Sequence, residues 1–457
     1  MSTLLLDRSQ VPAPAPVRPF SFPAVSRSKL KNGIPLVFSE TEGLPVVTFS
    51  LLLPGGALRE APEQSGLASL TASLLESGTS RLSAAEIAER VEDLGIRLSV
   101  GTSWEMSHAD FTVLSSKARE AAALIAELVS DPIFPDEEVE RVRSQQLAGI
   151  LQKRADPRGL ANEVVGRYIF SPDSPFSRAL SGTPETVKTL EREQIRRFHA
   201  AGFTPSGSSL VVAGNLPQDE LYWLADEAFG GGSGVEPTEI SCPTEPRSRQ
   251  VQVVVVDRPG AVQSELRVGH VGVARNSPDY FALVVMNTIL GGAFSSRLNL
   301  NLREKNGFTY GASSSFIMRR RPGPFLISTA IQTEVTGAAI RETLSELDRI
   351  RSSTVSSAEL ADATQYVAGT FPLRLQTTDG VASSLVEIVV HGLDDRYFDS
   401  FAERVLSVSA EEVEAVASKY IRPDELTILV AGDAEKVVPQ LGELNLGQVE
   451  VVKADEL

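Results

Sequence analysis

Two side chains in the stretch GGAFSSRLNLNLREKNGFTYGASSSF, residues 291–316, have types and a spacing that could do chemistry. Arg303 and Tyr310 lie seven residues apart, the first near the end of an expected helix and the second on an expected strand. A guanidinium and a phenol that converge on one point form a pair of donors for a substrate carbonyl or a developing oxyanion. The alternative is that Arg303 pairs with a nearby acid and Tyr310 lies at the edge of a core.

The residues between and after this pair predict how it is positioned. The dipeptide Asn306-Gly307 favours a left-handed residue that closes the helix just after Arg303. Alternation over 308–316 then predicts a strand on which Tyr310 points into a cavity. Gly311 on that strand would let a peptide backbone approach closely. Phe308, Gly311 and Ser313 are therefore candidate walls of a substrate site.

Cysteine and histidine are too scarce for a local metal motif. The single cysteine, Cys242, excludes an intrachain disulfide and a Cys-rich zinc site. The four histidines are far apart, and none has a second His or Cys within a few residues; they are His108, His199, His270 and His391. Structural or surface roles are favoured for all four. A zinc site built from His108, His199 and distant acids is the remaining alternative.

A second stretch, GLASLTASLLESGT at residues 66–79, predicts an amphipathic helix whose leucines recur at helical spacing. Its other face, at i, i+3 and i+4, carries only the small residues Ser69, Ala72 and Ser73. Taken alone, so bare a face indicates a close contact between the helix and a sheet. The spacing of these three residues admits a second interpretation.

Some zinc peptidases carry His-x-x-Glu-His on a helix, where the two histidines bind zinc and the Glu is the general base. The stretch resembles the setting of this motif in the pitrilysin family, the inverzincins, in which Gly-Leu-Ala precedes the motif's first His and Gly-Thr follows it. Ser69, Ala72 and Ser73 stand where that family has His, Glu and His. The family's further zinc ligand, a Glu about 76 residues downstream, falls near Gly149, where the sequence has no carboxylate.

The stretch around Arg303 and Tyr310 resembles the same family's C-terminal domain, with a helix ending Leu-Arg-Glu, a Gly and an aromatic strand. In active members, the Arg and Tyr of this segment face the zinc across a chamber. The resemblance extends from about Val25 to Gly442 and implies that role for Arg303 and Tyr310. Zinc binding and base catalysis by this chain are not expected, because serine is a poor zinc ligand and alanine cannot act as a base.

The elements around both stretches repeat, and they predict an α+β fold of two homologous domains. The segments 192–216 and 410–434 each give a helix, a turn and a strand that ends in Val-Ala-Gly. We expect an extended arm over 1–22, a first domain over 23–229, a linker over 230–249 and a second domain over 250–457. Each domain should be a mainly antiparallel sheet with helices packed on one face, and the whole chain half of a clamshell.

The composition excludes some classes of protein. Of 457 residues, 43 are Lys or Arg and 59 are Asp or Glu, a net charge of −16 that argues against nucleic-acid binding. The basic run Arg319-Arg320-Arg321 beside Pro322 is predicted to be a solvated turn. The sequence shows no secretory signal and no apolar run near the ~18 residues of a membrane span. We therefore expect a cytoplasmic protein, or a periplasmic one if a signal was removed.

Together these features predict a non-catalytic, substrate-binding subunit of a heterodimeric zinc peptidase. The chain itself would bind no cofactor and would be inactive alone. A homologous partner chain with His-x-x-Glu-His would supply the zinc and the base, and Arg303 and Tyr310 would hold a peptide substrate. The alternatives are an inactive scaffold subunit and a stand-alone peptide-binding homodimer.

Overall fold

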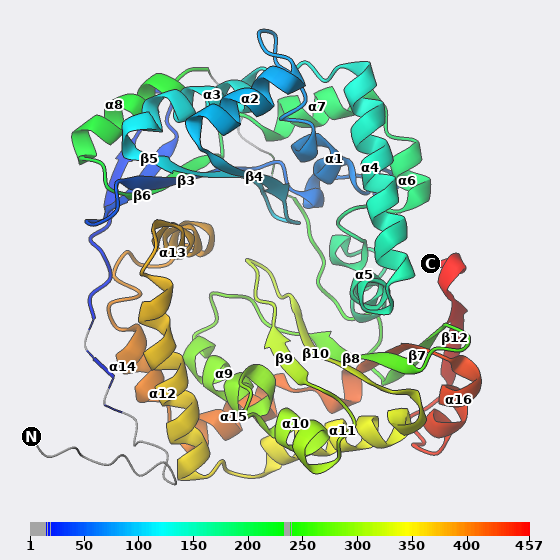
Figure 1. Cartoon of the computed structure of the whole chain (residues 1–457). Coiled ribbons are helices and arrows are strands. Elements are labelled where there is room, and N and C mark those ends of the chain that lie inside the picture. Colours follow the sequence, from blue (N-terminus) through cyan, green and yellow to red (C-terminus); the bar gives the residue numbers. More distant parts are fainter. Residues whose placement is uncertain (1–14, 16, 19, 233–237, 239) are drawn as a thin grey trace, which may run out of the picture.

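The computed structural model describes residues 15, 17–18, 20–232, 238 and 240–457. Most of the predicted N-terminal arm and part of the predicted linker lie outside these residues. Two six-stranded mixed sheets dominate the molecule and face one another, each with its own helices on the outside (Figure 1). The prediction of an α+β fold with two homologous domains is confirmed.

The first sheet has the order β1-β2-β6-β3-β5-β4, with only the β2–β6 pair parallel. Its strands are β1 (Ser26–Lys29), β2 (Pro35–Glu40), β3 (Val46–Leu53), β4 (Arg97–Thr102), β5 (Ser107–Leu114) and β6 (Ser209–Gly214). The helices of this half are α1 (Leu67–Ser73), α2 (Ala84–Leu94), α3 (Ala118–Ser130), α4 (Asp136–Ala155), α5 (Pro157–Ile169), α6 (Pro184–Lys188), α7 (Arg192–Gly202) and α8 (Gln218–Phe229).

The second sheet has the order β12-β7-β11-β8-β10-β9, with both pairings of β7 parallel. Its strands are β7 (Gln252–Asp257), β8 (Gln263–Val271), β9 (Ala312–Phe316), β10 (Pro324–Gln332), β11 (Thr427–Gly432) and β12 (Val449–Lys453). The helices are α9 (Tyr280–Asn287), α10 (Arg297–Asn299), α11 (Thr336–Ser352), α12 (Ser357–Arg374), α13 (Thr378–His391), α14 (Phe401–Leu406), α15 (Ala410–Tyr420) and α16 (Ala434–Gly442).

One helix from each half crosses to the inner face of the other half's sheet. Helix α5 of the first half packs on β8 and β11, and α13 of the second half packs on β3 and β6 (Figure 1). Leu160 and Val164 of α5 form a small buried cluster with strand residues of the second sheet, among them Val254 and Leu429. Each sheet thus has helices of its own half on the outer face and one helix of the other half on part of its inner face, which the prediction of helices on one face did not include. The two halves form a single interlocked body.

The start of the described chain also ties the halves together. The rings of Phe20 and Phe22 contact Phe371 and Phe398 of the second half, with centroids 5.4 and 5.3 Å apart. The Arg27 guanidinium donates to the Asp395 carboxylate, with Nε 2.9 Å from each oxygen. The segment that leads into β1 is therefore a strap across the two halves, which its Pro- and Ala-rich composition does not indicate.

The turn Arg319-Arg320-Arg321 is a joint between the halves, so the prediction of a solvated turn was wrong. The Arg319 guanidinium lies between the rings of Trp104 and Phe176, 4.0 and 4.4 Å from their centroids. Burial lowers the pKa of Arg319 to about 10. Arg321 donates to the backbone oxygen of Ile240 at 3.0 Å. Aromatic faces attract a guanidinium that has lost its water, which sequence composition alone does not reveal.

One helical stretch among the described residues, Tyr280–Lys305, is long and apolar enough to span a membrane by length and composition. Of its most apolar window, 61% is buried inside the protein. The backbone is extended at Ala293 and again at Ser296, so the stretch is interrupted. These features are those of a core helix.

Candidate functional site

Helix α1 carries the small-residue face and is shorter than predicted. It ends at Ser73, and turns replace the expected helix up to residue 79. It packs against β4, α7 and α4. Ala72 is buried, Ser69 is half-buried and Ser73 is exposed. The helix does contact the sheet, at β4, but only Ala72 of the small-residue face is fully buried.

The four positions of the degenerate zinc site do not fit zinc. Gly149 lies on α4, half-buried, and an added Cβ there would meet no atom within 4 Å. Together with Ser69, Ala72 and Ser73, the site offers two hydroxyls, a methyl group and a hydrogen, and no imidazole or carboxylate. The described residues contain no group of three or more His, Cys, Asp or Glu that could hold a metal ion.

A buried carboxylate fixes the entry to α1, and sequence reasoning missed it. Glu60 accepts hydrogen bonds from the backbone N–H groups of Gly66 at 3.2 Å and Ala68 at 2.6 Å. Burial raises the pKa of Glu60 to about 7, although these hydrogen bonds oppose the rise. Gly66 has φ 97°, and an added Cβ would lie 2.7 Å from the oxygen of Ser181. The retained glycine is therefore needed by the backbone and not by a metal.

Arg303 lies where the sequence predicted, at the end of a helical segment. The Gly307 N–H donates to the Arg303 carbonyl at 3.0 Å, and Gly307 has φ 65°, the expected left-handed conformation. The guanidinium lies over the ring of Phe294, 4.4 Å from its centroid, and pairs with Glu304 at 3.3 Å. Arg303 thus pairs with a nearby acid, as the alternative interpretation expected, and that acid is the next residue in the sequence. The sequence did not indicate the contact with Phe294.

The predicted strand over 308–316 was wrong for its first four residues, since β9 begins only at Ala312. The Thr309 hydroxyl donates to the Gly311 oxygen at 2.9 Å and accepts from the Gly311 N–H at 3.0 Å. The Asn299 amide bonds both backbone groups of Ala312, each at 2.9 Å. Such side-chain bonds compete with a strand ladder and turn the chain before β9.

This turn exposes Tyr310. Its side chain is 93% exposed and makes no hydrogen bond to the described residues, so it is not the edge of a core. Tyr310, Gly311 and Ser313 line a pocket of about 480 Å³, together with Phe294, which is 71% exposed. Phe308 packs against the second half's core instead. Phe294 thus lies next to both Arg303 and the pocket of Tyr310.

The pocket's floor joins the two halves. Arg267 on β8, 2% exposed, donates to Asn162 of α5 at 2.8 Å and to Glu265 at 2.9 Å. At the rim, Arg158 of α5 contacts Glu265 at 3.5 Å. Among the described residues, Tyr310 with its free hydroxyl and the exposed ring of Phe294 thus line a pocket together with the hydrogen-bonded Arg267. Such an arrangement is suited to binding an extended polar chain.

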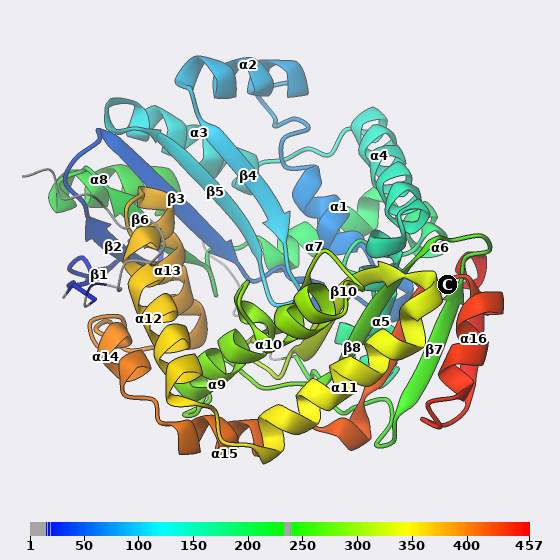
Figure 2. The same ribbon diagram turned by 60° about the horizontal axis from the view of Figure 1, so that its bottom comes forward.

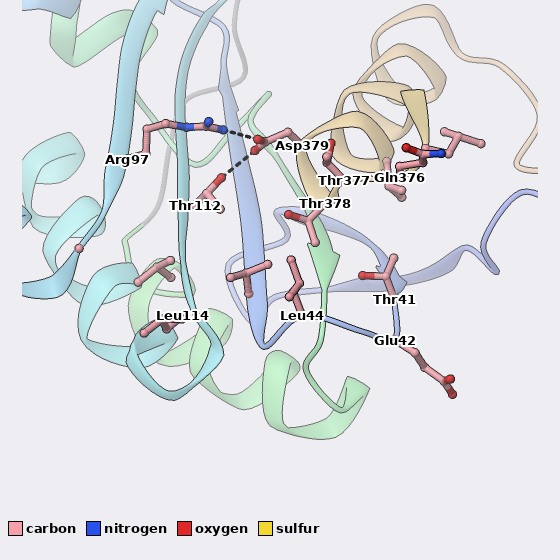
Figure 3. Close-up of a pocket in the computed structure, with 15 residues that line it drawn as sticks. Thr41, Glu42, Leu44, Arg97, Thr112, Leu114, Gln376, Thr377, Thr378 and Asp379 are labelled. Atoms are coloured by element: carbon pink, nitrogen blue, oxygen red, sulfur yellow. Dashed lines mark hydrogen bonds and ion pairs between the residues drawn. The ribbon is translucent and has the colours of Figure 1, made fainter. Parts of the chain in front are cut away.

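A second pocket, of about 450 Å³, lies where α13 meets the first sheet (Figure 3). The Asp379 carboxylate accepts hydrogen bonds from Thr112 at 2.7 Å and Thr48 at 3.0 Å, and it pairs with Arg97. Burial alone would raise the pKa of Asp379, but these hydrogen bonds outweigh it and hold that pKa below its usual range. Asp379, Thr112 and Arg97 are therefore already bound to one another, whereas Thr41, Glu42 and Gln376 line the same pocket without side-chain partners among the described residues.

Comparison with known proteins agrees with the fold and with the motifs. Residues 36–165 match the profile of the insulinase peptidase family M16, and residues 189–366 match the peptidase M16 inactive domain. The chain belongs to the peptidase M16 family, which confirms the resemblance drawn from the residues around α1 and Tyr310.

Several relatives align over nearly their whole length. An uncharacterized zinc protease of Streptomyces coelicolor is 25% identical over 401 residues, covering 86% of each chain. A Helicobacter pylori protein called a non-peptidase homolog is 24% identical over 409 residues, covering 88% of this chain and 93% of its own. Relatives described as a zinc protease and as a non-peptidase homolog thus have nearly the same sequence identity to this chain. The residues at the zinc positions distinguish this chain from active peptidases.

Solved structures show the same architecture. A peptidase M16 inactive domain from Pseudomonas fluorescens superposes with a TM-score of 0.84 at 25% identity, covering 90% of this chain and 98% of that one. A protease from Helicobacter pylori superposes with a TM-score of 0.83 at 19% identity, covering 90% and 99%, and supports the fold alone.

Proposed function

We propose that this chain is the non-catalytic, substrate-binding subunit of a heterodimeric zinc peptidase. The observation that carries the proposal is the exposure of Tyr310, a large amphipathic side chain without a hydrogen-bond partner among the described residues. The neighbouring Phe294 is also exposed, and its ring lies under the guanidinium of the half-buried Arg303. A folded chain gains nothing from leaving these groups in water, whereas a site completed by a second chain would use them.

In this proposal the partner chain, a homologue with His-x-x-Glu-His, binds the zinc and supplies the base. The Tyr310 hydroxyl donates to the carbonyl oxygen of a bound peptide, and the Arg303 guanidinium stabilises negative charge as it forms. Phe294 stacks on the guanidinium and limits its motion. Ser69, Ala72, Ser73 and Gly149 leave the corresponding zinc position of this chain without function, so the chain is inactive alone.

The test measures cleavage of a quenched fluorescent peptide, and zinc content by mass spectrometry, for this chain alone and mixed with a His-x-x-Glu-His homologue from the same organism. We expect neither peptide cleavage nor bound zinc for this chain alone, and we expect peptide cleavage in the mixture. Tyr310→Phe and Arg303→Ala should each lower the rate of the mixture by about 10²–10³-fold. Tyr366→Phe and Arg341→Ala, which remove an exposed Tyr and an exposed Arg from α12 and α11, should leave it unchanged.

The other outcomes separate the alternatives. Stoichiometric zinc and activity in the isolated chain would contradict the proposal. Mixtures in which both variants keep full activity would leave this chain as a scaffold subunit. A stable homodimer that binds peptide, and that no zinc-bearing chain joins in size-exclusion chromatography, would favour the stand-alone peptide-binding function.

A further inference from the structure

A third pocket, of about 380 Å³, has a charge opposite to that of the protein. Four arginines and one glutamate line it, in a chain with 16 more acids than bases. The arginines are Arg154, Arg167, Arg178 and Arg247. The pockets that contain Tyr310 or Asp379 share none of these residues, so the site is separate from the one in the proposed function.

Three of the four arginines form no ion pair with an acidic side chain among the described residues. Arg154 forms an ion pair with Glu163 at 3.0 Å, which neutralises the pocket's one acid. Arg167, Arg178 and Arg247 form no ion pair within the described part of the chain. The charges of the pocket between α2 and α3 are balanced by comparison, since three basic residues there face three acidic ones. Three unpaired guanidinium groups around one cavity repel each other unless an anion lies between them.

Two of the three arginines without an ion pair, Arg247 and Arg178, are held in place by neutral contacts. Arg247 donates to the Arg167 carbonyl at 3.0 Å, and its guanidinium lies over the Tyr168 ring at 5.0 Å. Arg178 is half-buried and donates to the Glu60 carbonyl oxygen at 3.4 Å. Burial lowers the pKa of Arg178, and the nearby carboxylates of Glu60 and Glu63 only partly oppose this. Arg178 and Arg247 are therefore oriented before any ligand binds, whereas the Arg167 guanidinium is exposed.

We propose that this pocket binds a small anion that carries two or more phosphate charges. Planar guanidinium groups match phosphate oxygens in pairs, and three of them can surround one polyphosphate group. The volume lies in the range of small-molecule sites, and Val164 and Pro172 add apolar wall. The lining comes from the segment before α1, from the end of α4, from α5, from the loop between α5 and α6, from the start of α6, and from Arg247 and Leu457. Bound phosphate would therefore hold these segments together.

The test is isothermal titration of the full chain with pyrophosphate, ATP, inorganic phosphate and citrate, followed by thermal unfolding with each. We expect saturable one-to-one binding of pyrophosphate or ATP and a rise in unfolding temperature with concentration. ATP binding more tightly than pyrophosphate would identify an organic phosphate, and equal binding would identify the phosphate groups alone as the ligand.

The double variant R167Q/R247Q removes two exposed guanidinium groups and should weaken binding about tenfold or more. The matched control is R196Q/R341Q, which changes the net charge equally at two exposed arginines outside every described pocket. Unfolding without ligand verifies that both variants fold. The proposal fails if no probe binds saturably, if both variants lose affinity equally, or if citrate binds as tightly as pyrophosphate.

Discussion

Helices α5 and α13 occupy equivalent places in the two halves, and they begin in the same way. Asp156 caps α5 by accepting from the Gly159 N–H, and Thr377 caps α13 by accepting from the Gly380 N–H. Each helix follows a long helix of its own half and then crosses to the other sheet (Figure 2). The apolar residues that meet the sheet also match in spacing, with Leu160 and Val164 in α5 corresponding to Val381 and Leu385 in α13.

The polar contacts at these two helix starts have opposite charge. Two residues after the cap, α5 has Arg158 and α13 has Asp379. Arg158 contacts the acid Glu265, whereas Asp379 accepts from the hydroxyl of Thr48. Thr48 pairs with Ala213 of β6 and Glu265 with Ala431 of β11, so the two partners are equivalent positions of the two sheets. Burial of apolar residues therefore determines that each helix packs on the other half's sheet. The polar contacts at the two helix starts differ and are not needed for this packing.

The largest expected effect tests whether apolar burial couples the halves. Leu160→Ala and Leu385→Ala each remove a fully buried side chain at the exchange and should cost about 2–5 kcal/mol of unfolding free energy. Both tryptophans, Trp104 and Trp223, lie in the first half and report on it by fluorescence, while circular dichroism reports on the whole chain. Coupled halves predict that both signals shift together in urea for either variant. Separate transitions would show that each half unfolds alone.

A smaller change in unfolding free energy should distinguish the polar contacts of Asp379 from that of Arg158. Asp379→Ala leaves Thr48, Thr112 and Arg97 without their common acceptor and should cost about 1–3 kcal/mol. Arg158→Ala removes one contact of a largely exposed side chain and should cost at most about 1 kcal/mol. Urea unfolding at neutral pH measures both, and equal costs would contradict the difference drawn between the two helices.

The pH dependence of the first variant follows from the lowered pKa of Asp379. A carboxyl whose pKa is lower in the folded state contributes stability above its unfolded pKa, which is about 3.9 for Asp. That contribution is lost as the pH falls through the folded pKa. The difference between the wild type and Asp379→Ala should therefore be constant from pH 5 to 7 (chosen conditions, about one to three units above that pKa) and shrink in more acidic solution. Arg158→Ala should show no such loss from its own ionisation.

Local sequence signals predicted much of this architecture. Strand β3 has the predicted bounds 46–53, and the helix–turn–strand repeat before Gly214 and Gly432 is present in both halves. These elements follow from short-range periodicity, caps and turns. The exchange of α5 and α13 did not follow, because a helix with an apolar face carries no information about which sheet it will cover.

For the candidate site too, the sequence predicted the local features and missed those that depend on packing. The residue types at Ser69, Ala72 and Ser73 predict that this chain binds no zinc, and this stays a prediction. Gly307 has the predicted left-handed backbone. The contact of Phe294 with Arg303 and the turn before Ala312 depend on long-range packing and on the Asn299 amide, so periodicity misplaced the start of β9. Glu60 was missed because the charge of a buried carboxylate is satisfied by backbone N–H groups, which a sequence does not display.

The smallest expected effect on stability concerns the position in the second half that corresponds to Arg97. Arg97 is the first residue of β4, where it lies opposite Thr112 of β5, and its side chain forms an ion pair with Asp379. The corresponding position in the second half, directly before β9, is Gly311. A Cβ added to Gly311 would meet only the Asn299 oxygen, at 3.8 Å, so Gly311→Arg should change the unfolding free energy by no more than about 0.5 kcal/mol.

The same substitution should nevertheless abolish binding in the pocket of Tyr310. An Arg side chain at 311 extends from the pocket wall into the space beside Tyr310. The position on α5 that corresponds to Asp379 is the like-charged Arg158, and the pocket's acid, Glu265, already contacts Arg158 and Arg267. Gly442→Arg, at an exposed glycine with open space around it, is the control for added charge and bulk. A strongly destabilised Gly311→Arg would show that the end of β9 is packed and not open. Stability close to that of the control, together with lost peptide cleavage in the mixture, would show that the second half keeps open the space that the first half fills with an ion pair.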